Sequence, residues 1–174
     1  MELEAVKNTA DQEDLTTDYD KLQLAETRQR IYRIVKGQLW ERFEESFCSG
    51  TVIKILKDSC DICMDEAEEP IFLWECVSEN LMDPTYLALL IKNKDLPVIG
   101  SLFQSLLTNE FMITYEMLSS LIMSITDVLE NKRDIPLHQK YLDAIIKELK
   151  ADCDKAEERM HFITDSYPEI IKSI

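Results

Sequence analysis

The chain has 174 residues, 34 of them acidic and 19 basic, so its formal charge at neutral pH is −15. Because nucleic acids are bound by clustered Lys and Arg, this excess of acid argues against nucleic acid as a partner. Apolar residues make up 45% of the chain, enough for one core, whereas three glycines and five prolines are few for the turns of an all-β fold. The composition predicts an all-α protein, an irregular helical bundle.

The first segment, residues 1–17, is predicted to be a disordered acidic tail. Met1 to Asp20 contain seven acidic residues and one Lys, without the apolar centre of a signal peptide. Five cysteines, an odd number, favour a reducing cytosolic setting over a disulfide framework. The longest uncharged stretch, Leu96 to Asn109, is shorter than the roughly 20 residues of a membrane span, so no transmembrane helix is predicted.

Residues 18–66 are predicted to form a helical hairpin. From about Asp18 to Phe47, apolar residues recur every three or four positions, the pattern of a helix buried on one face. After Ser49 and Gly50, a second helix with Val52, Ile53, Leu56, Cys60 and Cys63 is expected to fold back on the first. The first helix also carries a predicted basic face, formed by Arg28, Arg30, Arg33, Lys36 and Arg42.

Residues 67–134 are predicted to form a core bundle of short helices. Asp83 followed by Pro84 is a strong helix start, an N-cap carboxylate before a proline at the first helical position. The apolar run from Val98 to Leu107 is expected to be a largely buried helix near the centre of the core. Thr114 is expected to cap the next helix, which ends near Asn131.

Residues 135–174 are predicted to form a long amphipathic helix that opens at Pro136 and has a truncated end. Its apolar positions approximate a heptad seam, which indicates contact with another helix, either in the same bundle or in a second copy as a homodimer. The predicted seam consists of Leu142, Ile145, Leu149, Cys153, Ala156, Met160, Ile163 and Tyr167.

No pattern for catalysis, a cofactor or a metal emerges from the sequence, so a non-enzymatic protein without a cofactor is predicted. Cys60 and Cys63 have the spacing of a zinc or redox pair, but no second close pair accompanies them, and core packing is the favoured interpretation. His138 and His161 have no nucleophile or His-x-x-Glu-His pattern nearby. We expect both to lie at the surface.

Two blocks of the sequence resemble a family. The first, ETRQRIYRIVKGQLWERFEESFCS, resembles the cytosolic helix after the transporter domain of long-tailed sodium/proton exchangers. These are the sperm-type exchangers of solute carrier family 9, subfamily C, and the related plant Salt Overly Sensitive type. Leu39-Trp40, Glu44-Glu45 and Ser49 fit the family pattern, while Ser46 stands where a glycine is usual, so the turn is either reshaped or displaced to Gly50.

The second block, EERMHFITDSYPEIIKSI, is similar to the segment of that family in which a charged helix reaches an aromatic-Pro step. In relatives, a Lys-Thr-Arg-Gln motif and a cyclic-nucleotide-binding-like domain follow. The ion-binding aspartates of the family lie in membrane helices that this sequence lacks, so no family site residue is carried over. A voltage-sensor-like module, which the sperm type has between the two blocks, is also missing.

The resemblance implies a cytosolic regulatory or coupling segment of a multi-pass sodium/proton antiporter, which does not itself transport sodium ions or protons or regulate pH alone. Its partners would be the transporter and downstream regulatory domains of the same protein. The basic face would meet either an anionic membrane surface or the acidic segment from Asp61 to Glu79. The alternative is an independent acidic helical adaptor that binds partner helices.

Overall fold

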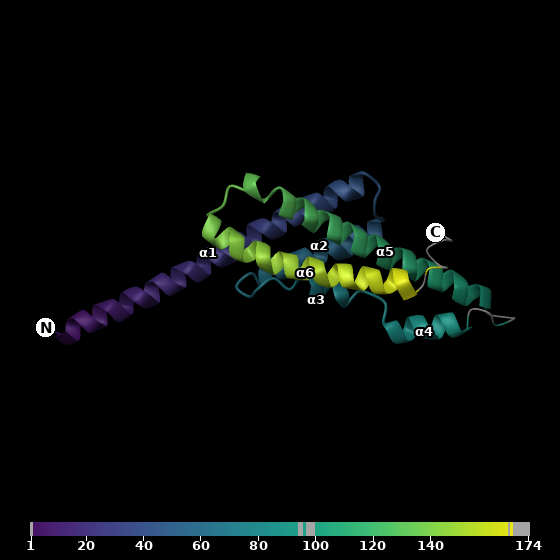
Figure 1. The fold of residues 1–174 in the computed structure, drawn as a ribbon, viewed down its shortest axis with the longest axis horizontal. Helices are drawn as coiled ribbons and strands as arrows, with labels where there is room; N and C mark the ends of the chain where they lie inside the picture. The colour runs from purple at the N-terminus through teal and green to yellow at the C-terminus, as the bar shows by residue number, and fades with distance from the viewer. Residues whose placement is uncertain (1, 94–95, 97–99, 167, 169–174) are drawn as a thin grey trace.

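The computed structural model describes residues 2–93, 96, 100–166 and 168, with most side chains described from Asp18 onward. All regular secondary structure in this described part is helical, which confirms the predicted all-α class (Figure 1). The elements in chain order are α1 Glu2–Glu44, α2 Gly50–Asp65, α3 Leu73–Ser78, α4 Pro84–Asn93, α5 Gly100–Glu130, the 3-10 turn η1 Lys132–Asp134 and α6 Gln139–Ser166.

The first helix, α1, extends well beyond the other helices at its N-terminal end (Figure 1). Residues 2–17, within the segment predicted to be disordered, are helical as the beginning of α1. Because a helix without packed neighbours is only marginally stable in water, disorder of this segment in solution stays a prediction.

The turn after α1 forms at Ser46, not at Gly50. Ser46 has the left-handed backbone conformation (φ 64°). The Phe47 N–H donates to the carbonyl of Arg42 at 2.9 Å, and the Ser46 N–H donates to that of Phe43 at 3.0 Å. This pair of hydrogen bonds is the Schellman motif, which usually places glycine where this chain has Ser46. The sequence prediction that the helix runs to Phe47 is therefore three residues too long.

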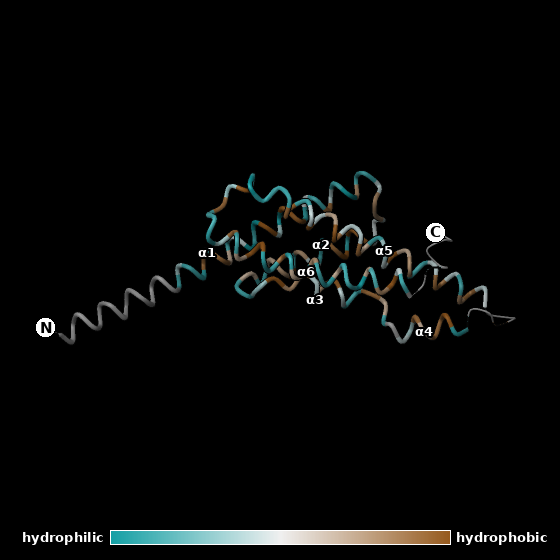
Figure 2. Tube along the Cα trace, viewed as in Figure 1, coloured by the Kyte–Doolittle hydropathy of each residue, from teal (hydrophilic) through white to brown (hydrophobic). Residues whose placement is uncertain are grey.

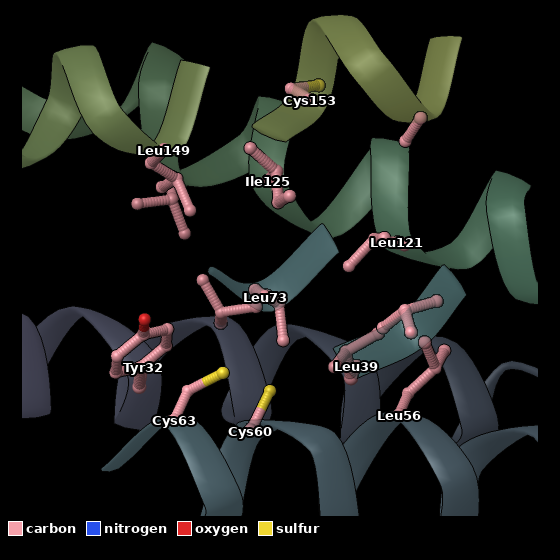
Figure 3. Close-up of a cluster of buried hydrophobic side chains, with 14 of the residues drawn as sticks. Tyr32, Leu39, Leu56, Cys60, Cys63, Leu73, Leu121, Ile125, Leu149 and Cys153 are labelled. Carbon is pink, nitrogen blue, oxygen red and sulfur yellow. The ribbon is translucent and has the colours of Figure 1, made fainter. Parts of the chain in front are cut away.

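The predicted hairpin of α1 and α2 is present, and it forms one side of the core. Its apolar stripes meet because residues three and four apart share a helix face. Figure 3 shows Leu39 of α1, Leu56 of α2 and Leu149 of α6 pointing into the same cluster. All three side chains are fully buried. One core therefore joins helices from the beginning, middle and end of the chain.

Helix α4 begins as predicted at Asp83-Pro84. The backbone N–H of Thr85 donates to Asp83 Oδ1 at 2.6 Å. Leu87 and Leu90 of α4 form a second, smaller cluster with Leu107 of α5, and Met82 packs against it, as expected for a hydrophobic staple. Figure 2 shows the hydrophobic residues along α4, which lies at the end of the molecule, apart from the main core.

Helix α5 is one continuous helix of 31 residues, so the prediction of a new helix start at Thr114 is wrong. Thr114 is buried in the middle of α5. A threonine caps a helix only where the chain leaves helical geometry, and no Pro or Gly follows Gly100 before Glu130. The segment from Val98 to Leu107 was expected to lie near the centre of the core, and for its described residues this is wrong, since Leu102 is 59% exposed. Val98 and Ile99 lie outside the described residues.

Helix α6 begins at Gln139, three residues after Pro136, and η1 occupies part of the break that precedes it. The predicted seam is confirmed as a buried stripe, but its partners are helices of the same chain, mainly α5 together with α1 and α3. The buried members are Leu142, Ile145, Leu149, Cys153, Ala156 and Ile163, with Met160 partly buried. In this single chain the stripe is covered by its own helices, and a homodimer contact through it stays a prediction; Tyr167 lies outside the described residues.

One helix of the described chain, α5, is long and apolar enough to cross a membrane. The sequence-based expectation of no candidate span considered only uncharged stretches, and Glu110, Glu116 and Asp127 interrupt the apolar residues of α5. Core helices of soluble proteins have the same length and composition, and 44% of its most apolar 18-residue stretch is buried in the bundle. Length and hydropathy alone are therefore weak evidence for a membrane location of α5.

Candidate functional site

The five predicted basic residues of α1 do not form a single exposed face. Arg28, Lys36 and Arg42 turn toward other helices, where each meets a carboxylate. Arg30 and Arg33 are exposed, and Arg30 pairs with Glu26 on its own helix. The prediction of one basic face is wrong because three of its members are used to hold the bundle together.

Arg28 makes the most extensive of these contacts, and only 7% of its side chain is exposed. Its guanidinium binds Glu148 of α6 in a bidentate pair, with Nε donating to Oε2 at 3.0 Å and Nη2 to Oε1 at 2.9 Å. Nη1 donates to the carbonyls of Ala67 and Glu68 at 3.2 and 3.1 Å. The N–H of Ile71 also donates to Glu148 Oε2, at 3.1 Å.

We call these groups the Arg28 junction: the side chains of Arg28 and Glu148, the carbonyls of Ala67 and Glu68, and the amide of Ile71. The junction joins α1, the loop between α2 and α3, and α6 at one place. A guanidinium has five donors in a fixed plane, which suits this combination of a carboxylate and two carbonyls. Lysine has a single ammonium and cannot reproduce that geometry.

The remaining inward-facing basic residues add two further links. Lys36 Nζ donates to Asp61 Oδ2 of α2 at 2.6 Å. Arg42 pairs with Asp127 of α5. Of the two roles considered for the basic residues, contact with the acidic segment from Asp61 to Glu79 is thus observed in part, through Lys36 and through the backbone contacts of Arg28.

A second buried carboxylate, Asp152, lies one turn after Glu148 on α6. It is 2% exposed, and its Oδ2 accepts the backbone N–H of Trp74 at 2.9 Å. Lys155 donates to Oδ1 at 3.1 Å and also to Glu75 of α3 at 2.7 Å. Burial raises the pKa of Asp152, which the hydrogen bonds from Trp74 and Lys155 only partly offset.

Stability should therefore depend on pH through Asp152. Because its pKa is raised on folding, the folded chain binds the proton more tightly than the unfolded chain, and the free energy of unfolding falls as pH rises above 3.8 toward the raised value. In Asp152→Asn this decrease is absent. Urea unfolding of both proteins from pH 4 to 7 should show the difference growing in favour of the variant. A constant difference across this range would contradict the assignment.

Sequence reasoning did not identify Glu148 and Asp152 as important residues. They are four residues apart, and each comes one position before a seam residue, Leu149 or Cys153. The sequence did offer one signal, the repetition of a carboxylate at the border of the apolar stripe. A side chain at this border lies at the edge of the buried interface, where it can reach a partner on another helix. Their partners lie up to 120 residues away in the chain, and no local pattern indicates such pairs.

The cysteines are free in the described structure, and most are buried. Cys60 and Cys63 belong to the main core, in agreement with the favoured interpretation of that pair. Burial raises the pKa of the Cys60 thiol to about 12, which keeps it protonated at neutral pH. His138 and His161 are exposed, and no group of three or more His, Cys, Asp or Glu suited to a metal ion occurs in the part of the chain that was described.

The arrangement holds helices together through partly buried charge pairs. An open groove between the N-terminus of α2 and α5 is lined mainly by hydroxyl and amide side chains, and Glu116 in it accepts the backbone N–H of Ser49 at 3.0 Å. A carboxylate beside a helix N-terminus is stabilising, so this contact also has a structural role. In comparisons with known proteins, no family model and no curated protein matches this sequence.

Proposed function

We propose that this chain is a cytosolic coupling segment of a sodium/proton antiporter, which links the transporter domain to regulatory domains and does not itself transport ions. The proposal combines the resemblance of the two sequence blocks with one structural observation, the Arg28 junction. A segment that transmits a displacement between two domains needs its first and last helices joined rigidly. Arg28 on α1 and Glu148 on α6 form such a joint.

The geometry of α1 supports the same role. Its C-terminal half is packed in the bundle, and its N-terminal part extends outward as a continuation of the same helix (Figure 1). In the packed part of α1, Asp20 accepts hydrogen bonds from Lys140 and Tyr141 of α6 at 2.9 and 2.5 Å, so a displacement of this part is carried into α6. In this proposal Arg30 and Arg33, which are exposed, are the residues left to meet an anionic membrane surface.

The first experiment reads the transcript that encodes this chain. The proposal requires about a dozen apolar membrane spans upstream and a Lys-Thr-Arg-Gln continuation downstream. The full polypeptide is then expressed in cells without sodium/proton exchange, and sodium-dependent recovery of intracellular pH after an acid load is measured. Recovery by the wild type and slower recovery by Arg28→Ala are expected.

Two control variants separate coupling from stability in that assay. Lys21→Ala removes an exposed charge on the same helix, at a residue without a role in the proposal, and should leave recovery unchanged. Leu149→Ala weakens the core without removing a junction group and should slow recovery less than Arg28→Ala at equal protein abundance. A transcript without upstream membrane spans would overturn the antiporter proposal.

The second candidate function is an acidic helical adaptor, and the end formed by α4 and α5 favours it. Leu89 and Leu102 are 52% and 59% exposed, and Tyr86 and Leu106 are exposed as well. No charged residue occurs from Pro84 to Ile91, so a partner helix would meet an uncharged apolar surface there. A transcript encoding only this chain would favour the adaptor over the antiporter.

A further inference from the structure

Two cysteine sulfurs meet where α3 packs on α2. Cys60 and Cys63 lie one helical turn apart on α2, and Figure 3 shows both sulfurs pointing from α2 toward the core. Cys76 comes from α3, and the Cys63 thiol donates a hydrogen bond to Cys76 Sγ at 3.7 Å. Cys63 and Cys76 are thus neighbours in space, although 13 residues separate them in the chain.

The two members of this pair differ in their access to solvent. Cys63 is fully buried, and burial raises the pKa of its thiol well above the usual range, which keeps it protonated as a donor. Cys76 is only partly buried. Burial also raises the pKa of Cys76, and the nearby carboxylates of Glu79, Glu66 and Glu75 raise it further; the hydrogen bond from Cys63 offsets part of this rise, because that bond stabilises the thiolate of Cys76. Cys76 is therefore the sulfur that a small oxidant reaches first.

We propose that Cys63 and Cys76 are a peroxide-sensitive thiol pair that closes a disulfide between α2 and α3. In the first step the Cys76 thiol loses its proton, and the thiolate attacks one oxygen of hydrogen peroxide. The O–O bond breaks, Cys76 becomes a sulfenic acid, and the leaving hydroxide takes up the proton from Cys76 and departs as one water. In the second step Cys63 sulfur attacks Cys76 sulfur, the S–O bond breaks, and the hydroxyl leaves as water with the Cys63 proton. Two thiols lose two electrons in total, and one peroxide is reduced to two waters.

The required movement is small. A disulfide has sulfurs about 2.05 Å apart, so the present 3.7 Å separation must shorten by roughly 1.7 Å. Helix α3 has only six residues, and its contacts with Asp152 and Lys155 hold it against α6, so the approach falls mainly to the two cysteine side chains. The buried hydroxyl of Tyr32 adjoins Cys63 and has no hydrogen-bond partner of ordinary geometry in the described structure, which leaves it free to donate to the Cys63 thiolate as that thiolate forms.

The disulfide would act on the Arg28 junction. The loop segment between Cys63 and Cys76 contains the carbonyls of Ala67 and Glu68 and the amide of Ile71, all of which belong to the junction. Closing a covalent loop around this segment restricts its unfolded states and resists its local opening. This proposal does not depend on the antiporter proposal, because it concerns only groups within the bundle.

The test uses the full chain, reduced and then treated with hydrogen peroxide near neutral pH. Free thiols are counted after denaturation, and peptides are mapped by mass spectrometry without a reductant. We expect two of the five thiols to disappear, one cross-linked peptide pair containing Cys63 and Cys76, full reversal by dithiothreitol and a higher unfolding temperature. A Cys60–Cys63 link, cross-links between chains, or five intact thiols after extended treatment would each overturn the proposal.

Variants assign the two roles. In Cys63→Ser, Cys76 should accumulate as a sulfenic acid that dimedone labels, whereas in Cys76→Ser neither dimedone labelling nor a cross-link should appear at Cys63. Cys153→Ser, at another buried cysteine, is the matched control and should still form the link. Circular dichroism checks that each variant is folded. If Cys63→Ser fails to fold, the peptide map of the oxidised wild type still decides whether the Cys63–Cys76 disulfide forms. In the wild type treated briefly with peroxide, equal dimedone labelling of Cys63 and Cys76 would contradict the assignment of Cys76 as the first sulfur to be oxidised.

Discussion

Replacing Arg28 with alanine is expected to lower the free energy of unfolding by about 3 kcal/mol. The change leaves Glu148 without its counter-charge and the carbonyls of Ala67 and Glu68 without their donor. Removal of one partner from a buried ion pair typically costs about 3 to 5 kcal/mol, and the lower figure applies here because the Glu148 side chain is 26% exposed. Urea unfolding followed by circular dichroism measures the change.

The same measurement on two further proteins tests the explanation. Arg30→Ala should change the free energy by less than about 0.5 kcal/mol, because an exposed pair with Glu26 contributes little. The double variant Arg28→Ala/Glu148→Ala should lose clearly less than the sum of the two single losses, because each single change already breaks the pair. Additive losses would mean that Arg28 and Glu148 stabilise the bundle independently.

The sequence was informative about features that depend on neighbouring residues. The stripe through Ile31, Val35 and Leu39 predicted the buried face of α1, because a helical period is a local property. The N-cap at Asp83 was equally local, and the structure has it. The helix α5 was divided wrongly, since Thr114 has the side chain of a cap, and only the backbone geometry distinguishes a cap from a buried helical threonine.

Features that depend on residues distant in the chain could largely not be predicted from the sequence. The spacing of Arg28, Lys36 and Arg42 is compatible with an exposed basic face, and their inward direction follows from carboxylates on α2, α5 and α6. The seam of α6 has the same limitation, because a period of three and four is shared by an intramolecular core and a dimer contact. Only the packing of the whole chain distinguishes the two.

The second large effect concerns that seam. Leu149→Ala is expected to lower the free energy of unfolding by about 3 kcal/mol, within the range of about 2 to 5 kcal/mol for removing a fully buried leucine side chain. Lys147→Ala, an exposed change on the same helix, is the control and should have little effect. Because the partners of Leu149 belong to the same chain, the loss should be identical at protein concentrations tenfold apart. A loss that grows as protein concentration rises would instead indicate that the seam stabilises the protein through a second copy.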